Sequence, residues 1–146
     1  MGVPVNLNLL KPLMEQSHID SLDHYNMNPL LIMYLQEFGH DISKQLGSEV
    51  SEVNDYPSHY WALEKRYALT FLDLCAETLT PIAGGDIHSI NDGQICVYSE
   101  VGWFYDRVNN ECFKDFLDHS IKKAKKYLNH FSNKEPVLFS FTLFTP

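Results

Sequence analysis

The chain has 146 residues, the size of one domain, and we expect a single globular domain over residues 1–146. Hydrophobic residues make up 45% of the chain and charged residues 21%, a balance that excludes a wholly disordered protein. The formal net charge of −8 disfavours a protein that binds nucleic acid directly, because such a protein needs a basic surface.

The N-terminal region predicts little regular structure. Val5, Leu7 and Leu9 alternate with asparagine and predict a short half-buried strand, and the polar residues 16–27 predict a loop. No basic segment precedes an apolar one, so we expect no cleaved signal peptide. The longest apolar run, residues 30–35, is far shorter than the roughly 20 residues that span a bilayer. We therefore expect a cytoplasmic protein without membrane contact.

Two helices are predicted in the first half of the chain by apolar residues that recur every three or four positions. Asn28 and Pro29 are a favourable N-cap and first residue, which predicts a helix over about 29–46 that ends at Gly47. Two apolar rows predict a longer helix over about 57–79. Since these rows cover more than half of its circumference, we expect this helix to be central and packed on two sides.

The second half of the chain is predicted to alternate between strands and a helix. The Asn-Asp-Gly sequence at 91–93 lies between two β-rich runs and predicts a hairpin. Beyond it we expect one strand at 94–100 and another at 101–106. A third amphipathic helix, capped by Asn109 or Asn110, then presents one unbroken apolar stripe.

The run 136–144 predicts a final strand in which Phe139, Phe141 and Leu143 face one way. Because a strand this apolar would aggregate if it were unpaired, we expect it to lie inside the sheet or to be covered. Together the elements predict an α+β fold with about three amphipathic helices packed on a mostly antiparallel sheet of four or five strands.

Catalytic and ligand-binding motifs are missing from the sequence or weak. The three cysteines form no CxxC pair, so we expect neither a disulfide framework nor a metal site, and we expect no cofactor. Asp86 and His88 are the best local candidates for chemistry, because residues two apart on a strand face the same way and a carboxylate can orient an imidazole. Turn formation explains this segment equally well. A small enzyme that uses the Asp86 and His88 region is therefore an alternative, and we favour a protein that is not an enzyme.

Charge is distributed unevenly along the chain. Residues 1–106 hold 15 acidic and 4 basic residues, a net charge of −11, whereas residues 107–146 have a net charge of +3. Tyrosine and tryptophan are enriched in protein interfaces, and several stand near these carboxylates. We therefore expect a basic protein partner to bind through some or all of Glu49, Glu52, Asp55, Tyr56, Asp86, Asp92, Glu100, Trp103 and Tyr105.

Small size, acidity and weak catalytic motifs favour an inhibitor or immunity protein that neutralises a basic toxin or nuclease by direct binding. A toxin that binds nucleic acid presents a positive cleft, which an acidic protein can fill. A dimeric chaperone or adaptor for a secreted protein is an alternative reading. The sequence leaves open whether the chain is a monomer or a homodimer.

Overall fold

The computed structural model describes residues 27–132 and 136–144, and within this part the side chains of residues 97–101 are not described. The described residues form three α-helices, five strands and two short 3₁₀-helices. The strand predicted at 5–9 and almost all of the loop predicted at 16–27 lie outside the described residues. No described helix is long and apolar enough to cross a membrane.

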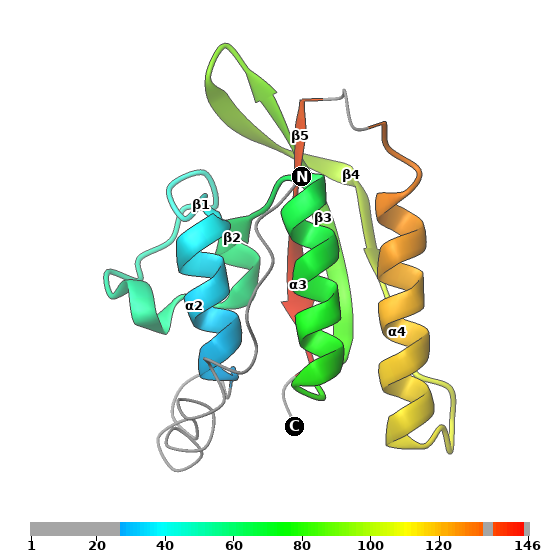
Figure 1. Cartoon of the computed structure of the whole chain (residues 1–146). Coiled ribbons are helices and arrows are strands. Elements are labelled where there is room, and N and C mark those ends of the chain that lie inside the picture. The colour runs from blue at the N-terminus through cyan, green and yellow to red at the C-terminus, as the bar shows by residue number, and fades with distance from the viewer. Residues whose placement is uncertain (1–26, 133–135, 145–146) are drawn as a thin grey trace.

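Three helices lie side by side, and the second and third of them contact the main sheet. They are α2 (Pro29–Phe38), α3 (Lys65–Glu77) and α4 (Phe113–Leu128). Helix α3 lies between the other two and in front of the sheet (Figure 1), and it contacts α2, α4 and the last strand. The prediction that this helix is central and packed on two sides is confirmed, as is the α+β class.

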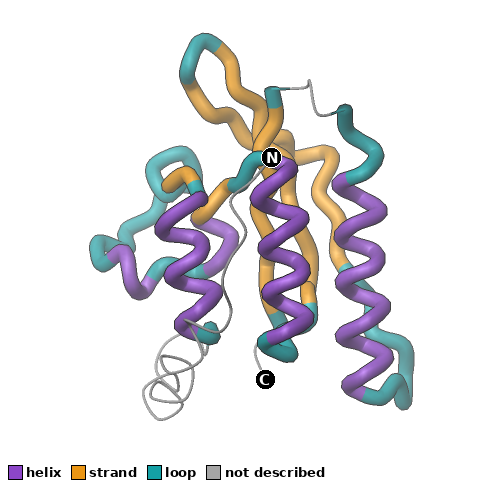
Figure 2. Tube along the Cα trace, viewed as in Figure 1, coloured by secondary structure: helices purple, strands orange, loops and turns teal. Residues whose placement is uncertain are grey.

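The main sheet has three antiparallel strands in the order β4-β3-β5, with bounds Gln94–Phe104, Ile82–Asn91 and Val137–Leu143. Asp92 and Gly93 form the two-residue turn between β3 and β4, both with positive φ, and confirm the predicted hairpin. The hairpin extends beyond the helices, as the tube in Figure 2 shows. A second sheet pairs β1 (His40–Asp41) with β2 (Trp61–Ala62).

The two faces of the main sheet pack against different partners. Phe139, Phe141 and Leu143 lie in the core beneath the helices, and Phe71 of α3 stacks on Phe141 with ring centroids 5.8 Å apart. On the opposite face, Leu138 packs in a small cluster. That cluster also contains Ile42, Ala62, Ile90 and Ile95. The β1–β2 region therefore covers part of the face that the helices leave open.

Strand β5 is protected on its outer edge. The backbone N–H of Leu63 donates to the carbonyl of Phe139 at 2.7 Å, and the N–H of Phe139 donates back at 2.8 Å. The hydroxyl of Ser58 donates to the Phe141 carbonyl at 2.7 Å. These bonds satisfy edge groups that could otherwise pair with another chain, and they confirm the expectation that this strand is covered.

The first helix is shorter than predicted. It ends at Phe38 and not near residue 46, because the chain turns at Gly39 and then pairs with β2. A β-carbon at Gly39 would lie 2.5 Å from the Leu35 carbonyl oxygen, so glycine permits this close approach. Ile42 follows the helical spacing by coincidence and belongs to the second apolar cluster.

The second helix begins later than predicted, and β4 is continuous. Residues 58–60 form a 3₁₀-helix (η3), and α3 starts only at Lys65, because the intervening segment pairs with β1 and β5. Strand β4 runs through the break expected near residue 100. Its register with β3 changes between Tyr98 and Trp103, where β4 has three more residues than its partner.

Candidate functional site

Residues 27–64 form an acidic lobe that comprises α2, β1, η2 (Val53–Asp55), η3 and β2. These elements lie together at the left of Figure 1. Glu49 and Glu52 are exposed in the connection that leads to η2. The side-chain amide of Gln36 on α2 donates to Asn54 Oδ1 at 2.7 Å, which ties η2 to α2. The acidic connection is therefore held against a helix.

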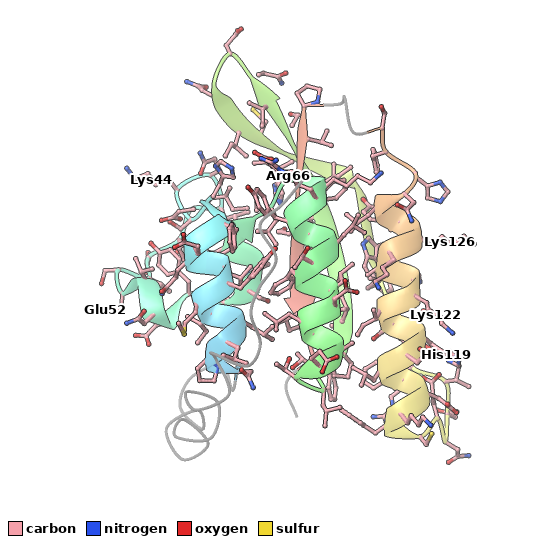
Figure 3. All side chains as sticks on the ribbon, in the orientation of Figure 1. Lys44, Glu52, Arg66, His119, Lys122 and Lys126 are labelled. Carbon is pink, nitrogen blue, oxygen red and sulfur yellow. The ribbon has the colours of Figure 1, made fainter. Side chains whose placement is uncertain are left out.

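The charge asymmetry of the sequence is also an asymmetry in space. The acidic lobe holds six acidic residues and one lysine, whereas α4 holds five lysines and two aspartates. Figure 3 shows Glu52 on one side of the molecule and Lys122 and Lys126 on the opposite side. The excess of acidic residues and the excess of lysines therefore lie on opposite sides of the molecule, although Lys44 lies on the same side as Glu52.

Three of the lysines on α4 already have partners within the chain. Lys122 pairs with Asp118 at 2.9 Å, and Lys125 pairs with Asp73 of α3 at 2.6 Å. Lys123 donates to the carbonyl oxygen of Phe104 at 2.8 Å. These contacts neutralise part of the positive charge and connect α4 to α3 and β4.

Tyr56 is an interior residue, which corrects its assignment to a partner-binding surface. Its side chain is only 7% exposed and packs against the rings of Tyr60 and Trp61. Its hydroxyl lies 3.2 Å from the buried hydroxyl of Ser43. A tyrosine can bury its ring when its hydroxyl finds a partner, and composition alone does not reveal this.

The other predicted binding residues are spread over several places. Trp103 is half-buried against Tyr127 of α4, with ring centroids 5.7 Å apart. Tyr105 donates its hydroxyl to Glu111 at 2.9 Å. Asp92 is exposed at the hairpin tip, and the side chain of Glu100 lies outside the described part. The eight of the nine predicted residues whose side chains are described therefore come from several separate segments of the fold.

A pocket of about 520 Å³ lies along β3 and β4, and sequence reasoning did not find it. It includes two of the predicted residues, Asp86 and Trp103, and its full lining is Ala83, Gly84, Gly85, Asp86, Gly102, Trp103, Phe104 and Thr142. Phe104 is 69% exposed. The sequence does not reveal the pocket because it does not reveal the register of β3 with its two neighbours. Pairing of Gly84 with both Phe104 and Thr142 brings the lining residues together.

His88 is a buried structural residue. Its Nε2 lies 2.8 Å from the hydroxyl of Ser140, and both side chains are 1% exposed. Its Nδ1 has no hydrogen-bond partner in the described part of the chain, so Asp86, His88 and Ser140 do not form a catalytic relay. Within the described residues, no three His, Cys, Asp or Glu side chains are placed to hold a metal ion. Burial of both hydroxyl and imidazole leaves no access for a substrate.

Burial makes the stability of the fold sensitive to pH through His59 and His88. It lowers the pKa of both imidazoles below 6.5, and the nearby Asp86 charge only partly opposes this. In the unfolded chain both groups gain protons near their ordinary pKa, whereas the folded chain resists protonation. The free energy of unfolding should therefore fall as pH drops below about 6.5.

Urea unfolding at about pH 7.5 and about pH 5.5 tests this expectation above the range in which ordinary carboxylates titrate. His88→Asn should reduce the pH dependence even if it also lowers stability at both pH values. Equal stability of the unmodified chain at the two pH values would contradict the assignment of the half-buried His59 and the buried His88 as neutral groups.

Residues 50–143 of this α+β chain match the model of a family of immunity proteins. The family is the one described as Immunity protein 40, and because the match covers well over half of the 146 residues, the chain belongs to this family. It is therefore an immunity protein, and its partner is a toxin. A comparison with curated proteins found no match. The matched range contains the pocket and all three strands of the main sheet.

Proposed function

We propose that this immunity protein neutralises a basic toxin of the nuclease type by binding it directly through the acidic lobe, in the cytoplasm. The observation that carries the proposal is the separation of charge. The acidic lobe has a net charge of −5, while three lysines of α4 are engaged within the chain. A nuclease has a positive site for its polyanionic substrate, which the acidic lobe would complement.

The acidic lobe also offers apolar contact area. Met33 on α2 is 41% exposed and Val53 in η2 is 42% exposed, and Val53 directly follows Glu52. Protein interfaces generally combine apolar contacts with a charged or polar rim. Such a surface would use charge to speed association and apolar burial to slow dissociation.

Co-expression tests the proposed neutralisation. The cognate toxin would be produced in cells with and without the immunity protein. We expect growth to be restored when both are present, and we expect the purified pair to run as a one-to-one complex in size exclusion with light scattering. Toxicity that persists despite soluble immunity protein would contradict the proposal. Protection without any complex would contradict direct binding.

A further inference from the structure

The pocket on the main sheet has a charged end and an aromatic side. Asp86 and Phe104 both line it, as do Gly84 and Gly102. Asp86 pairs with Ser140, and Gly84 pairs with Phe104 and Thr142. Paired residues lie on the same face of a sheet, and these lie on the face opposite Phe139 and Phe141, which pack beneath the helices. The helices therefore leave Gly84, Asp86 and Phe104 uncovered, whereas Trp103, which also lines the pocket, packs against Tyr127 of α4.

Among the described residues, the Asp86 carboxylate has no partner of opposite charge. It is half-buried, and within the described part of the chain no hydrogen bond or ion pair engages it. The nearby titratable groups that interact with its charge are His59, His88 and Tyr127. Burial lowers the pKa of both histidines and raises that of Tyr127, so all three are neutral at pH 7. A cation entering the pocket would meet an unpaired carboxylate.

Glycine at position 102 makes room for this carboxylate. A β-carbon on Gly102 would overlap Oδ1 of Asp86, so the carboxylate lies directly against the glycine backbone. A β-carbon on Gly84 would lie 2.6 Å from the carbonyl oxygen of Trp103. Alanine at position 84 would therefore clash with backbone that cannot move aside. Because neither glycine has a side chain, both leave open space in the pocket beside the exposed ring of Phe104.

We propose that this pocket receives a lysine or arginine side chain of the bound toxin, whose charge pairs with Asp86 and whose stem or guanidinium packs on Phe104. The inference rests on the proposed function, because it specifies one contact with the basic toxin. An aromatic face beside a carboxylate suits such a side chain, since the ring attracts the cation and the apolar stem covers the ring. Arginine fits best, because its planar guanidinium both stacks and pairs.

The experiment uses the full chain and two small molecules that differ in charge. N-acetyl-arginine amide carries the cation, and N-acetyl-citrulline amide is its neutral isostere. Each is titrated into ¹⁵N-labelled protein while the backbone amide signals of Gly84, Asp86 and Gly102 are followed. We expect saturable shifts with the arginine compound and at least tenfold weaker binding of the citrulline compound.

Variants of the chain separate charge from position. Asp86→Asn removes the charge while keeping the shape, and we expect at least a tenfold loss of arginine-amide binding. Gly102→Ala keeps the charge but displaces the carboxylate, and it should also weaken binding. Asp92→Asn at the exposed hairpin tip removes the same charge elsewhere and should leave binding unchanged.

The inference would be overturned by the absence of shifts at the three amides, by equal binding of the two compounds, or by unchanged binding to Asp86→Asn. Shifts of the same amides that depend on protein concentration alone would assign the pocket to a second copy of the chain and would also overturn it. None of these results touches the proposed function, which fails separately if the toxin is not neutralised or not bound.

Discussion

Phe71→Ala is expected to lower the free energy of unfolding by about 3–5 kcal/mol, the cost of removing a large aromatic ring from a closed core. Phe71 is fully buried on the central helix, with ring centroids 5.8 Å from both Tyr34 of α2 and Phe141 of β5. The ring therefore joins two helices to the sheet, and its loss leaves a cavity that none of these elements can fill alone.

Urea denaturation of the variant and the unmodified chain measures this loss. Leu79→Ala is the matched control, because it removes an apolar side chain that is 64% exposed, and it should cost less than about 0.5 kcal/mol. A cost below about 1 kcal/mol for Phe71→Ala would contradict the packing of α2, α3 and β5 around this ring.

Reversal of charge at two exposed positions of the acidic lobe, Glu49→Lys with Glu52→Lys, is expected to slow association with the toxin by about 10–100-fold at low salt. The pair changes net charge by +4 on the surface that we propose meets a positive toxin. Most of the effect should appear in the association rate, because these side chains steer the encounter before contacts form.

A variant with the same change of net charge elsewhere serves as the control for this reversal. Glu77→Lys with Asp115→Lys alters two exposed carboxylates outside the acidic lobe and outside the lining of the pocket. We expect it to slow association several-fold less, since steering depends on where the charge lies as well as on its total. Equal slowing by both variants would show that net charge alone matters, and would contradict a role for the acidic lobe as the docking surface.

Local patterns in the sequence predicted the helices and the hairpin, while contacts distant in sequence decided where the helices end. The apolar stripe of α4 and the Asn-Asp-Gly turn are local features, and the structure contains both. The start of α3 depends on Leu63 pairing with Phe139, a contact across 76 residues that no short window contains. Tertiary pairing there overrides a helical pattern that begins near residue 57.

Charge counting revealed where acidic residues concentrate in the chain, while their role in binding a partner stays a prediction. Counting acidic residues along the chain indicated the acidic lobe, because an exposed carboxylate contributes to the surface field whatever its exact setting. Tyr56 was assigned wrongly because its burial depends on the hydroxyl of Ser43. The pocket beside Asp86 depends on the register of three strands and on space left by Gly102, and sequence spacing reveals neither.

The association rate of the purified immunity protein with its toxin, measured by stopped flow over a range of salt concentrations, tests most directly the claim that acidic charge recruits a basic partner. Surface charges are screened over about 10 Å at 0.1 M salt and over about 3 Å at 1 M. We therefore predict a rate that falls steeply as salt rises, with a dissociation rate that changes little. An association rate that stays constant from low to high salt would contradict the account.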